Sequence, residues 1–106
     1  MADETARLSI VTPDAGMYVL SGEVDAHTAP QFAGHFEPLP GGVGDALVID
    51  MADVTFMDSS GLRVLIELNQ RVTEAGTSLT VRAPSRAVER IIEISGLSDL
   101  IEVSPA

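Results

Sequence analysis

Several residue types are missing or scarce in this sequence. It contains no cysteine and no tryptophan, and only one tyrosine and three phenylalanines. The lack of cysteine excludes disulfides, thiolate metal sites and cysteine nucleophiles. So few aromatic side chains leave little material for stacking on nucleic-acid bases.

Basic residues are scarce as well. Six Lys and Arg stand against sixteen Asp and Glu, so the net charge is -10 at pH 7. This charge opposes direct binding to nucleic acid or to anionic lipid, and it favours a protein partner with a basic face.

Long apolar runs are also absent. No run of about 18 apolar residues marks a membrane span, and the first ten residues, with two acids, do not form a signal peptide. We therefore expect a cytoplasmic protein. The chain is nevertheless 45% apolar, which excludes a disordered tail. Its 106 residues suffice for one core and not for two, so residues 1–106 are expected to form a single domain.

The first half of the chain predicts a hairpin followed by a helix. Segments 8–12 and 17–22 have the composition of strands and flank turn residues at 13–16. This predicts an antiparallel hairpin with a four-residue connection. A short helix is predicted from its N-cap Thr28 to about Leu39, because apolar residues recur there at helical spacing. His35 lies on the apolar stripe of this helix, where a packed core residue is expected. A loop at 38–45 follows.

Strands and helices alternate in the second half. The apolar run 46–51 predicts a central strand covered on both faces, and further strands are predicted at 78–82 and 100–103. One helix follows residue 58 and stops at Gly76, and another runs from Pro84 to Gly96. The order β-β-α-β-α-β-α-β predicts an α/β domain with a mixed sheet and helices packed against it.

The two longer helices have recognisable apolar stripes. In the helix that follows residue 58, Arg63 and Arg71 are each expected to pair with Glu67. In the same helix the predicted buried stripe holds Leu62, Leu65, Ile66, Asn69 and Val72. In the second helix it holds Ala87, Val88, Ile91 and Ile94.

The start of the longer helix carries the main chemical signal. Asp58, Ser59, Ser60 and Gly61 stand between the central strand and the helix. Ser, Asp and Gly cap helix N-termini, because they satisfy or expose the unpaired backbone N–H groups there. One or both serines are therefore expected at the helix start, near its partial positive charge, in a place that suits a phosphate.

This segment has other interpretations. The simplest is a plain helix cap, although two adjacent hydroxyls are redundant for one cap. A phosphoryl group there would add roughly -1.5 to -2 charges and could repel or block a partner surface. A serine hydrolase is disfavoured, because the Gly-x-Ser-x-Gly pattern is absent and the chain has only two histidines.

Two acids could meet at this place. Asp25 and Asp58 become neighbours if the bend after the second strand lies beside the helix start. The pair could orient a serine hydroxyl toward an external kinase or bind a metal. The preferred interpretation is that both are solvated loop acids, because no His/Asp spacing typical of a metal site accompanies them. No metal and no cofactor are expected.

Taken together, these segments resemble the STAS domain of bacterial anti-sigma factor antagonists. The resemblance covers residues 8 to 103. Three segments carry it: 20–25 (LSGEVD) with 28–29 (TA), 48–62 (VIDMADVTFMDSSGL) and 94–97 (ISGL).

The resemblance implies a partner switch that performs no catalysis. In that family the unphosphorylated antagonist binds an anti-sigma factor, which is also a serine kinase, and so frees a sigma factor for transcription. Phosphorylation of the serine after the motif aspartate ends the complex, and a serine/threonine phosphatase of the metal-dependent class resets it. By position Ser59 is the phosphoacceptor. Asp25 and Asp58 shape its surroundings, while Ser60 and Gly61 cap the helix and admit close contact.

The implied binding face comprises the helix from Ser60 and the bend from Asp25 to Thr28. Val64 and Leu68 lie to one side of the predicted buried stripe. They either widen that stripe or form a partly exposed apolar strip suited to a protein partner.

Two other functions stay open at this point. The first is a constitutive structural subunit of a stress-signalling assembly or lipid transporter, in which Ser59 is only a cap. The second is an enzyme or small-ligand binder that uses Asp25, Asp58 and Ser59, and it predicts a deep pocket at the helix start. Many family members have a further helix after the last strand, whereas this sequence stops at Ala106. A shortened C-terminus would expose an apolar patch or represent a minimal version of the domain.

Overall fold

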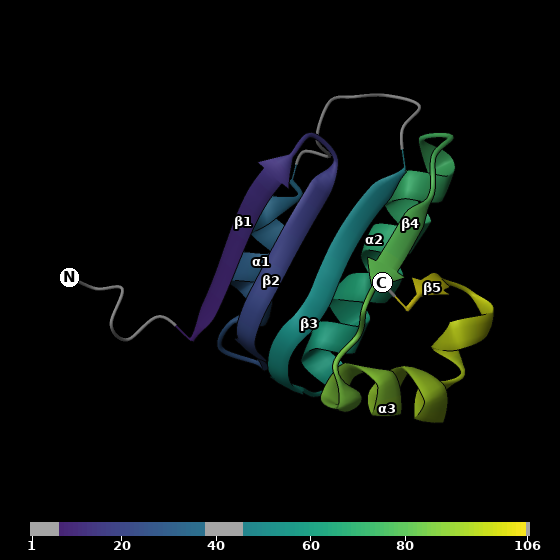
Figure 1. The fold of residues 1–106 in the computed structure, drawn as a ribbon. Helices are drawn as coiled ribbons and strands as arrows, with labels where there is room; N and C mark the ends of the chain where they lie inside the picture. The colour runs from purple at the N-terminus through teal and green to yellow at the C-terminus, as the bar shows by residue number, and fades with distance from the viewer. Residues whose placement is uncertain (1–6, 38–45, 106) are drawn as a thin grey trace.

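A five-stranded sheet forms the centre of the structure (Figure 1), a computed structural model that describes residues 7–37 and 46–105. β1 is antiparallel to β2, and every later neighbouring pair is parallel. The predicted mixed sheet with an N-terminal hairpin is therefore confirmed. The strands lie side by side in chain order: β1 (Leu8–Asp14), β2 (Met17–Val24), β3 (Leu47–Met57), β4 (Leu79–Arg82) and β5 (Glu102–Ser104).

In the described part of the chain, three α-helices connect the strands. α1 (Ala29–His35) and α2 (Ser59–Glu74) pack against each other behind the sheet in the view of Figure 1, and α3 (Arg86–Ser95) lies at the bottom of that view. α3 ends at Gly96, whose φ of 79° provides the predicted glycine stop. A 3-10 turn, η2 (Leu97–Asp99), precedes β5, which begins two residues later than the predicted start of the last strand.

The hairpin connection is shorter than predicted. β1 continues through Pro13 to Asp14, which pairs with Met17, so two residues connect the strands instead of four. Gly16 adopts φ 80°, a positive angle of the kind that two-residue hairpin turns require. Pro13 does not end β1 because this strand lies at the edge of the sheet, where a missing N–H is tolerated.

The central strand differs from its prediction in two respects. β3 extends to Met57 instead of ending at residue 51, because β2 continues to pair with it as far as Val24 and Met57. The prediction that both faces of this strand are covered was wrong as well. Only alternate residues of its first half, Leu47, Ile49 and Met51, are buried. The side chains between them point to the face opposite the helices and are partly exposed.

α1 is shorter than predicted. It ends at His35, while Leu39 and the predicted loop at 38–45 lie outside the described residues. Thr28 stands at the N-cap as expected. His35 is exposed, so its prediction as a packed core residue was wrong; its ring lies edge-on to Tyr18 and Phe36.

The predicted buried stripes of α2 and α3 each include one isoleucine that is in fact exposed. Ile66 is 40% exposed and Ile94 is 79% exposed, although both were placed in the core. Val64 and Leu68 are buried, so they widen the core-facing stripe, and the exposed-strip alternative was wrong. The reason is that α2 packs on α1 as well as on the sheet. In α3 the buried residues are Val88 and Ile92.

Candidate functional site

The candidate site lies at the carboxyl ends of β2 and β3. Val24 pairs with Met57 at the last step of this parallel ladder, and the Asp58 N–H donates to the Val24 carbonyl at 3.2 Å. The bend that starts at Asp25 therefore lies beside the start of α2. The arrangement that was expected to make Asp25 and Asp58 neighbours is therefore present in the fold.

Asp58 is the N-cap of α2. Its backbone is extended, with φ -115° and ψ -167°, and its Oδ1 accepts a hydrogen bond from the Ser60 N–H at 2.8 Å. This bond satisfies one of the first-turn amides that have no partner within the helix. The expectation that a serine, and Ser60 in particular, caps the helix was therefore wrong, because the carboxylate before the serines already does so.

Ser59 is the first residue of α2 and is exposed. No other described residue makes a hydrogen bond with its hydroxyl. Its neighbour Ser60 is only partly exposed. Of the two adjacent serines, Ser59 is therefore the more exposed.

Gly61 allows the first turn of α2 to lie directly on the strand ends. A Cβ built on Gly61 would stand 2.6 Å from Val24 Cγ1 and 2.8 Å from Met57 Cγ. These distances are shorter than real contacts of a Cβ, so any larger residue would push the turn outward or displace both side chains. Gly61 therefore allows close packing on the strand ends, while its expected place in a partner-binding face stays a prediction.

Asp25 organises the bend between β2 and α1. Its Oδ1 accepts from the backbone N–H groups of His27 and Thr28, at 2.9 and 3.1 Å. The Thr28 hydroxyl accepts from the Asp25 N–H at 2.9 Å and donates to the Glu23 carbonyl at 2.8 Å. The view that Asp25 and Asp58 are merely solvated loop acids was therefore wrong, since each carboxylate fixes a turn of the backbone.

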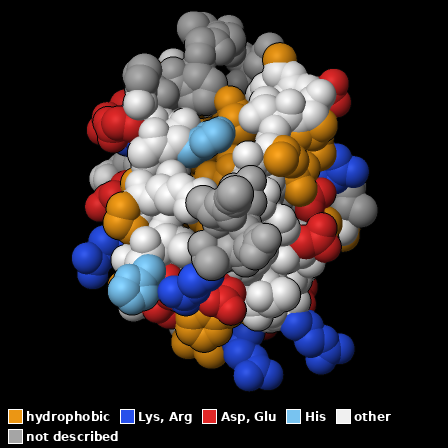
Figure 2. Space-filling model, turned by 90° about the vertical axis from the view of Figure 1, so that its left-hand side faces the viewer, with side chains coloured by type: hydrophobic (Ala, Val, Ile, Leu, Met, Phe, Trp, Pro, Cys, Tyr) orange, Lys and Arg blue, Asp and Glu red, His pale blue; other side chains and the backbone are white. Residues whose placement is uncertain are grey.

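Arg7 completes this bend and was missed in the sequence. Its guanidinium forms ion pairs with Asp25 and, at 2.8 Å, with Glu23. Figure 2 shows the side of the molecule that carries β1 and α1, where basic and acidic side chains lie close together along the lower edge. The pairing depends on the hairpin register, in which Leu8 stands opposite Gly22. No local pattern around Arg7 could have revealed it.

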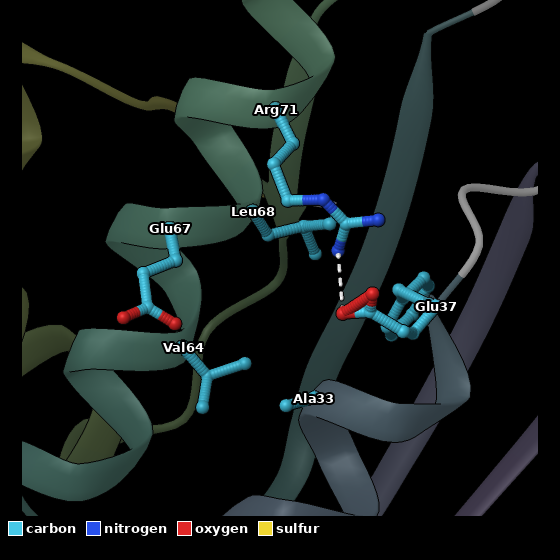
Figure 3. A pocket seen from close by; sticks show the side chains of 7 residues that line it. Ala33, Glu37, Val64, Glu67, Leu68 and Arg71 are labelled. Carbon is cyan, nitrogen blue, oxygen red and sulfur yellow. Dashed lines mark ion pairs between the residues drawn. The ribbon is translucent and has the colours of Figure 1, made fainter.

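A shallow pocket lies farther along α2, between α2 and α1 (Figure 3). Arg71 reaches across it to Glu37, with 3.7 Å between Nη1 and Oε2, and does not pair with Glu67 as predicted. The pocket is more than a helical turn from Ser59, so it is not the deep pocket at the helix start that a small-ligand site would need. Within the ranges 7–37 and 46–105, no group of three His, Asp or Glu side chains could hold a metal ion. The lining residues are Ala33, Phe36, Glu37, Val64, Glu67, Leu68 and Arg71.

The capping role of Asp58 can be tested by removing its carboxylate. We expect Asp58→Ala to lower the free energy of unfolding by about 1 kcal/mol, the usual cost of losing an N-cap. Asp58→Asn keeps an oxygen acceptor and should remain within a few tenths of a kcal/mol of the parent. Urea unfolding of the three proteins measures the difference. Equal losses in both variants would show that charge, and not the cap bond, stabilises the turn.

The fold and site define a small α/β domain with an exposed serine at the start of a helix. Residues 8–106 match the STAS domain, so the chain belongs to the STAS domain family. None of the helices in the described part of the chain is long and apolar enough to cross a membrane.

Its relatives include proteins of one functional class. The chain is 36% identical over 84 residues to an anti-sigma-B factor antagonist of Listeria monocytogenes, covering 79% of this chain and 74% of that protein. It is 35% identical over 85 residues to an anti-sigma-B factor antagonist of Bacillus subtilis, covering 80% and 77%. The crystal structure of an anti-sigma factor antagonist from Mycobacterium paratuberculosis is similar, with a TM-score of 0.76, 30% identity, and coverage of 93% and 85%.

Proposed function

We propose that this chain is an anti-sigma factor antagonist whose binding is controlled by phosphorylation of Ser59. In its unmodified form it binds an anti-sigma factor that has serine kinase activity, and the released sigma factor changes transcription in the cytoplasm. The kinase phosphorylates Ser59 and so ends the complex. A serine/threonine phosphatase of the metal-dependent class removes the phosphate. The chain acts by binding and catalyses no reaction.

The observation that carries this proposal is the exposed Ser59 hydroxyl on a fixed helix start. The Asp58 cap and the close seat of Gly61 hold the first turn of α2 in place. A kinase therefore meets an accessible acceptor on rigid backbone. A phosphate there needs no change of fold to alter the surface, because its effect is a local change of charge.

The proposed binding face surrounds this serine. Asp25 and Thr28 contribute the neighbouring bend, and Asp58, Ser60 and Gly61 shape the helix start. Farther along α2, the buried Val64 and Leu68 hold the helix against α1 and the sheet, so they would support this face from beneath without being exposed on it. Ile66 adds an exposed apolar side chain two turns after Ser59, on the same side of the helix. The net charge of -10 suits a partner with a basic face.

The alternative of a constitutive subunit used Ser59 as a helix cap. The structure assigns that role to Asp58, so Ser59 is not needed for capping. The constitutive-subunit alternative therefore no longer explains why a serine stands at position 59. This favours a role for the exposed hydroxyl itself.

Phosphate transfer by an anti-sigma factor kinase from the same host tests the proposal. With ATP, we expect one phosphoryl group to appear on the intact protein and to map to Ser59. Ser59→Ala should take up none and still bind the kinase, while Ser60→Ala, the matched control, should be phosphorylated. Phosphate on Ser60, or none in the presence of an active kinase, would overturn the switch. An unmodified Ser59 with a stable stoichiometric companion would favour the subunit role.

A further inference from the structure

Arg63 stands one helical turn after Ser59 on the outer side of α2. Both residues are exposed, and their i,i+4 spacing makes them neighbours on the helix surface. In residues 7–37 and 46–105, no hydrogen bond or ion pair engages the Arg63 guanidinium, and its predicted partner Glu67 does not pair with it. A free cation therefore lies within reach of any group attached to Ser59.

The other charged groups around Ser59 already have partners. Asp58 Oδ1 accepts from the Ser60 N–H, and Asp25 is paired with Arg7. Farther along α2, Arg71 is paired with Glu37. Neither Arg7 nor Arg71 is thus free to meet a new anion at the helix start, whereas Arg63 is.

We propose that Arg63 is the intramolecular partner of a phosphate on Ser59. An acidic group four residues before a basic one is the favourable order on a helix. A guanidinium also binds phosphate oxygens through paired, charge-assisted hydrogen bonds. The pair would draw the phosphate along the outer side of α2 toward Arg63, away from the Asp58 carboxylate that caps the helix.

The role of this phosphate–Arg63 pair in the cell rests on the proposed phosphorylation switch, to which it adds a second effect. Phosphorylation then removes two features from the binding face: the neutral hydroxyl of Ser59 and the free guanidinium of Arg63. A partner carboxylate that pairs with Arg63 in the complex loses its counterion at the same moment. One modification therefore both adds a repulsive charge and withdraws an attractive one.

The test installs phosphoserine at position 59 during translation, so no kinase is needed. Phosphorus NMR then follows the second ionisation of the phosphate in the parent and in Arg63→Gln. A nearby cation favours the dianion and lowers the pKa of the phosphate. We therefore expect this pKa to rise by about half a unit in Arg63→Gln. Arg86→Gln, which removes an exposed arginine from α3, is the matched control and should leave the value unchanged.

Each outcome decides the proposal. Equal pKa values in the parent and Arg63→Gln would overturn it. A shift that Arg63→Lys partly restores would support a charge pair, and high salt should reduce that shift. Circular dichroism of the unphosphorylated variants checks that the fold is kept, as expected for a side chain without partners. If the host kinase never modifies Ser59, the proposed function fails. The pKa measurement on the installed phosphate still tests the Arg63 pairing independently.

Discussion

Phosphorylation of Ser59 is expected to weaken the complex with the anti-sigma factor by about 100-fold or more. The unmodified hydroxyl is small and neutral, so a partner can enclose it at little cost. A phosphate brings roughly -1.5 to -2 charges to the same place. One Arg63 guanidinium does not neutralise this charge, so part of it is left uncompensated when the partner encloses it. Such a charge costs about 3 kcal/mol or more, and each 1.4 kcal/mol changes Kd about tenfold. Titration calorimetry of unmodified and fully phosphorylated protein measures the change.

Charge variants separate a local effect from one of net charge. Ser59→Glu carries a single charge and an imperfect shape, so we expect it to weaken binding by about tenfold. Ser59→Ala should keep the affinity within about threefold of the parent. Gln70→Glu adds the same charge at an exposed position three turns farther along α2 and is the matched control. An equal loss in Gln70→Glu, or full affinity after phosphorylation, would sink the idea of a local switch.

Local sequence signals predicted the end of α3 but not the end of α1 or the length of β3. Gly96 stops α3 because its own conformation does so, wherever the helix lies. The continuation of β3 to Met57 depends instead on pairing with β2, a segment more than thirty residues earlier. Ala52 and Asp53 are exposed and resemble loop residues, yet the parallel ladder carries the strand past them.

The side of a helix that becomes buried is likewise a property of its neighbours. Helical periodicity could have placed either Ile66 or Val64 toward the core, and only the position of α1 decides for Val64. At the site, the Asp58–Gly61 segment was visible in the sequence because its chemistry is local. Arg7 was not, because its contact with Asp25 depends on the register of the hairpin.

Gly22 is the position where a single methyl group should do the most damage to the fold. Its φ is 109°, a region that side chains rarely adopt, and a Cβ there would overlap the Arg7 carbonyl oxygen. The same Cβ would lie 2.9 Å from the Arg7 carbonyl carbon and 3.3 Å from Leu8 Cα. All three atoms are backbone, and the Arg7 carbonyl also accepts a 2.7 Å hydrogen bond from the Glu23 N–H. The start of β1 can therefore yield only by leaving β2.

We expect Gly22→Ala to lower the free energy of unfolding by about 3 kcal/mol or more, since backbone strain adds to the steric overlap. Gly76→Ala is the matched control: its φ of 85° is also positive, but nothing lies within 4 Å of the added Cβ. Conformation alone should cost that variant about 1 to 2 kcal/mol. Urea unfolding compares the two, and equal losses would show that the Arg7 backbone moves aside freely. A larger loss in Gly22→Ala would mean that the start of β1 is forced away from β2. That displacement also separates Arg7 from Asp25, so the same methyl group should loosen the bend beside Ser59.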